Sequence, residues 1–340
     1  MNIAVDAMGG DHAPGVIVQG SLWEHAESGV GITLVGDQSR IRKELGEGGD
    51  IGNGIQIHHC SQMVAMDESP LKVLRQKKDA SIMVAFDLVK RGKAEAVVSA
   101  GNSGATVGAA VLSLGRIKGV ERPALAGIFP GAKGNVVLID VGANVDTKPK
   151  QLFEFGIMGD IFARSLLHMD NPKVGLLNIG QEGSKGNEQV KIAHDLFTKG
   201  PFNFVGNVEG RDIFSGDIEV IVSDGFVGNV ALKLSEGMAE TVGIMFEREM
   251  SRGLISKLGF WLGRRAFENF KRNLDYAEYG GALLLGIKGV GIICHGSSSP
   301  KAIKNAIRTA TEFVNNHVQE RLEEGLSRFQ LKASDENAAT

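Results

Sequence analysis

The chain has 340 residues, of which 43% are hydrophobic and 23% charged, and its formal net charge is −3. This composition is typical of a globular protein, and the slightly acidic charge argues against a nucleic-acid partner. Two cysteines, Cys60 and Cys294, are too few for a disulfide framework or a zinc site, and nothing suggests a metal or a cofactor. No stretch approaches the roughly 20 apolar residues of a membrane span, and the first residues do not resemble a signal peptide, so we expect a cytoplasmic protein.

Short apolar runs rich in β-branched residues alternate with helix-like segments along the chain. Several runs are continuously apolar, which is typical of strands buried on both faces. The alternation predicts an α/β fold with a largely parallel sheet. We expect residues 1–330 to form one α/β domain and residues 331–340 a disordered tail. The expected strands are residues 3–5, 32–35, 55–57, 96–98, 124–129, 136–139, 174–177, 202–205, 220–222 and 291–294, and the clearest helices are residues 70–91, 149–168, 187–199, 229–250 and 300–324.

Polar residues of catalytic or binding type directly follow many of the expected strands. In open parallel sheets, ligands bind at the carboxyl ends of the strands, so these residues are expected to face one crevice. Alternatively, they begin turns and cap helices. The residues are Asp6, Ser99, Asp140, Asn178, Ser223, Asp224 and His295.

The uncharged stretch "VVSAGNSGATVGAA", residues 97–110, resembles an anion-binding loop that leads from a strand into a helix. Ser99, Asn102 and Ser103 offer neutral donors. Gly101 allows close approach of the backbone, and the following helix presents its first N–H groups. A plain strand-to-helix turn explains the same residues, and this alternative stays open.

Four further loops have a similar glycine-rich, polar character. In residues 176–190, Lys185 adds a mobile positive charge suited to phosphate, unless it only pairs with a nearby glutamate. Together such loops would form a site rich in backbone donors, which suits a phosphate and a polarised carbonyl oxygen. The other candidate residues in these loops are Asp6, Asp11 and His12 near the start, Asp140 and Asn144 in residues 138–149, Asn178, and Asp224 and Asn229 in residues 222–233.

A basic and apolar segment, residues 248–275, is expected to project as a helical element. Between Arg248 and Arg272 there are seven Arg or Lys and two Glu. Cations together with Trp, Phe and Leu are typical of a segment that lies in a membrane interface. Packing against a second subunit or the core, or binding of an acidic protein, would explain the pattern as well. The expected membrane-contacting residues are Leu254, Ile255, Leu258, Phe260, Trp261 and Leu262.

Nine sequence blocks, in order from about residue 2 to 325, resemble the phosphate acyltransferase family of bacterial phospholipid synthesis. They are "AVDAMGGDHAP", "VVSAGNSGA", "GRIKGVERPALA", "LIDVGANVD", "FGIMG", "LLNIGQEGSKGNE", "VSDGFVGNVALK", "YGGALLLGIKG" and "HGSSSPKAI". Ser103 and Val227 depart slightly, since many members are expected to carry Thr there. The resemblance implies a three-layer α/β/α fold similar to the isocitrate and isopropylmalate dehydrogenases and to phosphotransacetylase.

The resemblance also implies an activity. Inorganic phosphate attacks the thioester of a long-chain acyl group on acyl carrier protein, giving acyl phosphate for a membrane-bound glycerol-3-phosphate acyltransferase. A homodimer and peripheral attachment to the inner face of the cell membrane are implied as well. Two other classes compete: a non-catalytic scaffold for carrier and membrane, and a short-chain phosphotransacetylase that uses coenzyme A.

The chemistry suggests roles for the candidate residues. We expect Asn102, Ser103 and Lys185 to hold phosphate, and backbone N–H groups of residues 142–144 or of Gly225 to stabilise the oxyanion. His12 is the first candidate for protonating the leaving thiolate. Asp6, Asp11, Asp140 and Asp224 would orient donors. A covalent route through Cys60 or Cys294 is the alternative mechanism.

Overall fold

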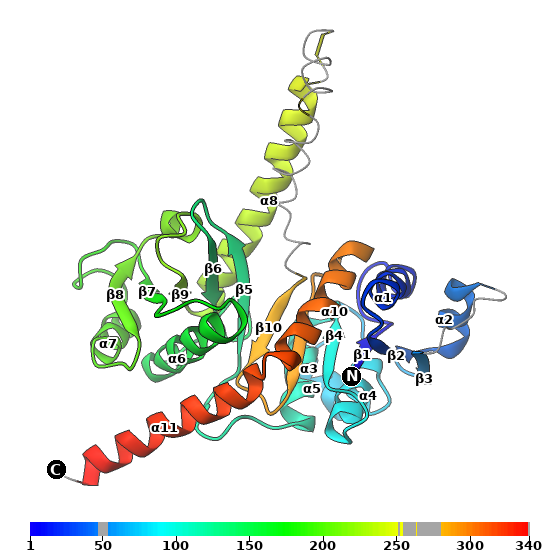
Figure 1. Cartoon of the computed structure of the whole chain (residues 1–340), viewed down its shortest axis with the longest axis horizontal. Coiled ribbons are helices and arrows are strands. Elements are labelled where there is room, and N and C mark those ends of the chain that lie inside the picture. Colours follow the sequence, from blue (N-terminus) through cyan, green and yellow to red (C-terminus); the bar gives the residue numbers. More distant parts are fainter. Residues whose placement is uncertain (47–53, 251, 254–262, 264–279, 339–340) are drawn as a thin grey trace.

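The computed structural model describes residues 1–46, 54–250, 252–253, 263 and 280–338. Its centre is an eleven-stranded sheet in the order β3-β2-β1-β4-β11-β10-β5-β6-β9-β7-β8 (Figure 1). The strands are β1 (Asn2–Asp6), β2 (Gly31–Gly36), β3 (Ile55–His59), β4 (Ala96–Ser99), β5 (Ala124–Pro130), β6 (Asn135–Ile139), β7 (Lys173–Leu177), β8 (Asn203–Val208), β9 (Val220–Val222), β10 (Ala282–Leu285) and β11 (Val290–Ile293).

The sheet consists of two parallel halves that run in opposite directions. Among the described strands, only the β11–β10, β10–β5 and β5–β6 pairings are antiparallel. The largely parallel sheet predicted from the sequence is confirmed. However, β1, β4 and β11 run in one direction and β6, β9 and β7 in the other. The register brings the carboxyl ends of both groups to one line across the sheet, since Ile292 and Ile139 are both level with the Leu283–Ala126 pair. The polar residues after the strands therefore come from two groups of opposite strand direction, and the expectation that they face one common crevice stays a prediction.

Helices cover both faces of the sheet, so the expected three-layer α/β/α architecture is confirmed. Neighbouring residues of a strand point to opposite faces, and Val98 and Val137 pack into one core whereas Val97 and Leu138 pack into the other. The first face carries α1 (Gly15–Ser28), α6 (Pro149–Leu166), α7 (Glu188–Phe197), α10 (Pro300–Asn315) and α11 (Val318–Ala338), and the second face carries α4 (Ser81–Lys90), α5 (Ser103–Ser113) and α8 (Gly225–Met250).

Three shorter helices complete the described chain: α2 (Gln38–Leu45), α3 (Pro70–Gln76) and the 3₁₀ helix η1 (Gly210–Phe214). Two helices expected as single elements are each divided. The segment 70–91 breaks between α3 and α4, where the backbone N–H of Ser81 and the Gln62 carbonyl form a hydrogen bond of 3.1 Å. The segment 300–324 breaks at His317, which has a positive φ of 51°. Beyond it, α11 continues to Ala338 and so includes most of the segment expected to be a tail.

Helix α8 leaves the sheet and projects away from the rest of the molecule (Figure 1). Only Gly225 and Gly228, in its first turn, are buried. Within the part of the chain that the structure describes, no helix is long and apolar enough to cross a membrane. The projecting helix predicted for residues 248–275 begins within α8, but its expected membrane-contacting residues, Leu254 to Leu262, lie outside the described residues.

Candidate active site

A cavity of about 750 Å³ lies on the second face of the sheet, over the central strands and beside α8; we call it the central cavity. Strands β5, β10 and β11 contribute its floor, and the start of α5 and the side of α8 contribute its walls. It is therefore bordered by both groups of polar strand ends. Its polar side chains are Ser103, Asn229, Lys233, Ser235, Glu236 and His295, and its large apolar side chains include Leu125, Ile128, Phe129, Phe214, Leu232, Leu234, Met238, Val242 and Ile293.

Asn102 caps the start of α5 and presents Ser103 to the central cavity. Its side-chain oxygen accepts a hydrogen bond from the Ala105 backbone N–H at 3.0 Å. Its side-chain nitrogen donates to the carbonyls of Met66 and Glu68, at 2.9 and 3.0 Å. Ser103, the first residue of α5, lines the cavity, but Asn102 does not. Because its amide is already engaged, Asn102 holds the loop, and the first turn of α5 is the part that faces the cavity.

Asp6, Ser99 and Gly101 form a buried cluster behind this loop. The Ser99 hydroxyl donates to the Asp6 carboxylate at 2.8 Å and accepts from the Gly101 backbone N–H at 3.0 Å. Burial raises the pKa of Asp6 above its ordinary value, against the lowering effect of its hydrogen bonds. None of the three lines the central cavity. Together they join the ends of β1 and β4 and fix where α5 begins.

Asp11 and His12 lie in the exposed loop after β1. The Asp11 backbone N–H donates to the Gly296 carbonyl at 2.8 Å, which brings this loop next to the residue that follows His295. Neither Asp11 nor His12 lines the central cavity, whereas His295 does. The Nδ1 atom of His295 lies 2.7 Å from the Ser297 hydroxyl. His295 was recognised in the sequence only as a polar residue after a strand, without a role.

Asp140 organises the loop after β6. Its fully buried carboxylate accepts hydrogen bonds from the backbone N–H groups of Leu125, Gly142, Ala143 and Asn144, at 2.8 to 3.1 Å, and from the Asn144 side chain at 2.8 Å. Burial nevertheless raises its pKa above the ordinary value. Because the N–H groups of residues 142–144 point at this carboxylate, the expectation that they stabilise a substrate oxyanion is wrong.

The loop after β9 is arranged in the same way. The Gly225 backbone N–H donates to the Asn144 carbonyl at 2.7 Å, so it too is not directed at a substrate. The Asp224 carboxylate accepts from the Val227 backbone N–H at 2.8 Å at the start of α8. Asn229, one turn further along α8, lines the central cavity, whereas Asp224 and Asn144 do not.

Asn178 and Lys185 lie together in the loop after β7, outside the central cavity. The Asn178 amide donates to the Lys185 carbonyl at 3.1 Å, and its oxygen accepts from the Ile179 N–H at 2.8 Å. The Lys185 side chain is exposed. The structure therefore brings Ser103 and Asn229 to one cavity but leaves Lys185 in a separate loop.

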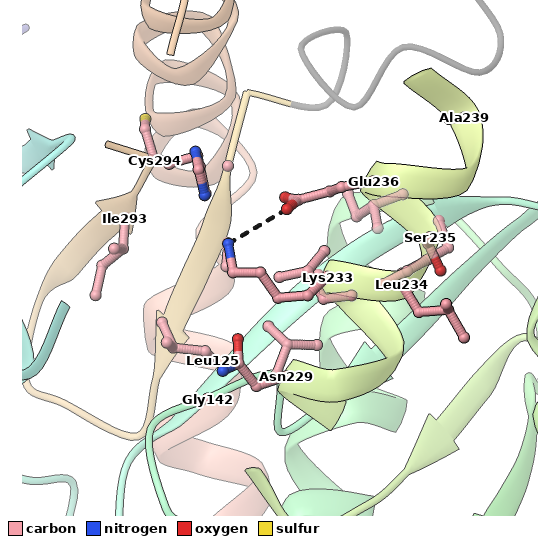
Figure 2. Close-up of a pocket in the computed structure, with 18 of the residues that line it drawn as sticks. Leu125, Gly142, Asn229, Lys233, Leu234, Ser235, Glu236, Ala239, Ile293 and Cys294 are labelled. Carbon is pink, nitrogen blue, oxygen red and sulfur yellow. Dashed lines mark hydrogen bonds and ion pairs between the residues drawn. The ribbon is translucent and has the colours of Figure 1, made fainter. Parts of the chain in front are cut away.

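Lys233 and Glu236 of α8 line the central cavity, although the sequence did not single them out. The Lys233 ammonium lies 3.3 Å from the Glu236 carboxylate, and both lie across from Ile293 and Cys294 (Figure 2). A lysine on a helix is usually solvated, so the residue type alone did not indicate that Lys233 lies at a functional site. The available signal was its spacing, since Lys233 stands one helical turn after Asn229.

Neither cysteine has the properties of a nucleophile. Cys294 lines the central cavity, but burial raises the pKa of its thiol to about 12, and the thiol donates to the Gly280 carbonyl at 3.3 Å. Burial likewise raises the pKa of Cys60 to about 12. Since the thiolate is the reactive form, both are poorly activated at neutral pH. The described residues contain no group of three or more His, Cys, Asp or Glu that could hold a metal ion.

Solved structures with a similar fold include two classes of enzyme. A phosphotransacetylase from Streptococcus pyogenes matches with a TM-score of 0.59 and 18% identity, over 93% of this chain and 94% of that one. A 4-hydroxythreonine-4-phosphate dehydrogenase from Klebsiella pneumoniae matches with a TM-score of 0.53 and 13% identity, over 94% and 99%. At these identities the likeness shows the fold, which is the one that the sequence resemblance implied.

Sequence relatives define the family. Residues 1–321 match the family described as "Fatty acid synthesis protein". A phosphate acyltransferase of Geobacter sulfurreducens is 54% identical over 324 residues, which cover 95% of this chain and 94% of the relative. A phosphate acyltransferase of Geobacter sp. (strain M21) is 53% identical over 327 residues, covering 96% and 93%. The chain belongs to this family of phosphate acyltransferases, and it is an acyltransferase, as the nine sequence blocks predicted.

Proposed function

We propose that the enzyme transfers a long-chain fatty acyl group from acyl carrier protein to inorganic phosphate, giving acyl phosphate and the carrier thiol. The observation that carries this proposal is the central cavity, in which a polar group of side chains adjoins a long apolar wall. A phosphate and a fatty acyl chain need these two environments side by side. The activity named for the relatives, phosphate acyltransferase, supports the same pair of substrates.

The acyl chain is proposed to lie along α8. From Asn229 to Val242 the helix rises by about 20 Å at 1.5 Å per residue, and both residues line the cavity. Phe129 and Phe214 stand on the β5 side, with their rings in edge contact at 6.2 Å. An extended cavity of this kind suits a long acyl chain better than an acetyl group, which argues against a short-chain phosphotransacetylase.

Phosphate is already a nucleophile at neutral pH, so the reaction needs positioning more than a strong base. A phosphate oxygen forms a bond to the thioester carbonyl carbon, the carbon–sulfur bond breaks, and the leaving thiolate takes up a proton. Ser103, at the start of α5, and Asn229, across the cavity, are proposed to contact phosphate. His295 is proposed as the proton donor because it lines the cavity, with His12 as the second candidate. Asp6, Asp140, Asn144 and Asp224 keep proposed roles in holding the loops.

A direct assay tests this function. The enzyme is incubated with inorganic phosphate and palmitoyl-acyl carrier protein, and acyl phosphate and carrier thiol are quantified. Equal or faster turnover of acetyl-coenzyme A would instead identify a short-chain phosphotransacetylase, and no turnover of any thioester would identify a scaffold. Lys185→Ala, in the same assay, tests the proposed contribution of the loop after β7, since an unchanged requirement for phosphate would exclude Lys185 from the site.

Membrane contact is proposed for residues 248–275, so that acyl phosphate is released next to a membrane-bound glycerol-3-phosphate acyltransferase. We infer a cytoplasmic enzyme attached peripherally to the inner face of the cell membrane. Support comes from the basic and apolar composition of this segment. Flotation with anionic liposomes tests the proposal, with a variant carrying Leu258→Glu and Trp261→Glu. Undiminished flotation of this variant would exclude insertion through the segment.

A homodimer is proposed because α8 exposes apolar side chains along one stripe. Val227, Val230 and Met245 are 42%, 52% and 53% exposed, do not line the central cavity and are spaced at helical intervals. Apolar stripes of this kind in water usually contact another molecule. Light scattering of the full chain measures its mass, and a double substitution of Val230 and Met245 by Glu is expected to convert the dimer into a monomer.

A further inference from the structure

Lys233 of α8 differs from every other described residue around the central cavity in its charge. Among the described lining residues it is the only Lys or Arg, and Glu236 is the only Asp or Glu. We propose that the Lys233 ammonium binds inorganic phosphate inside the central cavity, and that Glu236 holds this ammonium when phosphate is absent. The inference rests on the proposed function, in which phosphate is the acceptor of the acyl group.

The position of Lys233 on α8 directs it toward the other polar groups. Asn229, Lys233 and Glu236 are separated by four and three residues, a spacing that places side chains on the same side of a helix. The Lys233 Nζ atom lies 3.3 Å from Glu236 Oε2. The Lys233 side chain is 49% exposed and that of Glu236 is 18% exposed. The ammonium is therefore held at the cavity wall and remains accessible to a small anion.

Phosphate needs a cation in these surroundings. Most of the cavity lining is apolar, and transfer of an anion from water to such a surface is unfavourable without a partner of opposite charge. Ser103 marks the start of α5, whose N-terminus carries a partial positive charge. Lys233 adds a full charge across the same cavity. The proposed phosphate position is thus between the first turn of α5 and Lys233.

The contact between Lys233 and Glu236 is suited to exchange. A partly exposed ion pair contributes little to stability, because both groups are well solvated when apart. Phosphate can therefore replace Glu236 as the partner of the ammonium without unfolding α8. By contrast, Lys185 belongs to a loop that does not line the cavity.

Kinetics of three variants test the proposal. Lys233→Met keeps the length of the side chain but removes the charge, and we expect it to raise the KM for phosphate by about ten- to hundredfold, the range of one charge-assisted hydrogen bond. The KM for palmitoyl-acyl carrier protein should change little. Lys233→Arg should retain most of the phosphate affinity. Lys199→Met removes an exposed lysine after α7 and serves as the matched control, with wild-type constants expected.

Thermal unfolding provides a measurement that does not depend on turnover. Inorganic phosphate, compared with chloride at equal ionic strength, should raise the Tm of the wild type and of Lys199→Met but not that of Lys233→Met. A wild-type KM and a wild-type phosphate-induced Tm shift in Lys233→Met would refute the proposal. So would an equal loss in folded Lys233→Arg, since the charge would then not matter. If the wild type made no acyl phosphate, the proposed function would fail, while the Tm shifts would still decide whether Lys233 binds phosphate.

Discussion

Replacing Asp140 by Asn should lower the stability of the protein substantially, although the two side chains have nearly the same shape. One carboxylate oxygen accepts from Leu125, Gly142 and Ala143, and the other accepts from the backbone and side-chain nitrogens of Asn144. An amide has only one acceptor oxygen. Even in the better orientation, its NH₂ group faces Asn144, whose backbone N–H then lacks an acceptor and whose side-chain nitrogen keeps only its hydrogen bond to the Pro123 carbonyl.

The expected magnitude follows from these contacts. Each buried N–H group without a partner costs about 1–3 kcal/mol, so the two of Asn144, which are only partly buried, cost at most about 2–6 kcal/mol. Part of this cost is offset because the neutral amide avoids the desolvation that raises the Asp140 pKa. We therefore expect a loss at the lower end, about 2–4 kcal/mol of unfolding free energy after the offset, a large share of the roughly 5–15 kcal/mol typical of a native protein.

Urea unfolding followed by circular dichroism measures this loss. Asp146→Asn, in the exposed part of the same loop, is the matched control and should stay within about 0.5 kcal/mol of the wild type. If Asp140→Asn lost no more stability than Asp146→Asn, the five hydrogen bonds would not be what holds this loop. The prediction separates a structural role of Asp140 from a direct role in the reaction.

Three further predictions concern the cavity and a buried acid. Cys294→Ala should retain turnover, because the thiol pKa of about 12 leaves little thiolate, and loss of activity in a folded variant would favour a covalent route. Phe214→Ala should favour acyl chains longer than the wild type prefers, by about fourfold in kcat/KM for each additional buried methylene. A series of acyl carrier proteins with acyl chains of increasing length measures this preference. Phe226 is exposed and does not line the cavity, so Phe226→Ala should leave the preference unchanged. Burial raises the pKa of Glu154 above 4.5, so the folded state binds its proton more tightly and the contribution of Glu154 to stability falls as the pH rises through the folded pKa. Glu154→Gln should therefore gain stability relative to the wild type between pH 4.5 and neutrality, and a constant difference in unfolding free energy would contradict this.

The sequence predicted the buried strands well because their physical signal is local. Continuous apolar runs at residues 136–139 and 220–222 became β6 and β9. The break between α3 and α4 was missed because residues 77–80 have no helix-breaking composition, and the hydrogen bond from Ser81 to Gln62 that accompanies the break joins distant residues. Helix boundaries set by such tertiary contacts leave no pattern in the sequence itself.

The candidate site was predicted less completely, because a polar residue that follows a strand does not show in which direction that strand runs in the sheet. Asp6 and Asp140 looked equivalent in sequence, but the antiparallel pairings of β10 and β5 give the strands that precede them opposite directions in the sheet. Both carboxylates are buried and accept hydrogen bonds from neighbouring protein groups, Asp6 from the Ser99 hydroxyl and Asp140 from backbone N–H groups of its own loop. Lys233 was missed for the opposite reason, since a charged residue on a helix is normally solvated and only the fold turns it toward a cavity.

The three antiparallel pairings at the centre of the sheet also determine when the cavity can form. Leu283 of β10 pairs with Ala126 of β5, so the floor joins segments that lie far apart in the sequence. Contacts between such distant segments form slowly, and their loop-closure cost precedes any gain in packing. During synthesis, a nascent chain that ends before residue 282 lacks β10 and β11 and has only parts of the cavity walls. Binding capacity should therefore arise only after the ribosome has released nearly the whole polypeptide, and incomplete chains should be inert.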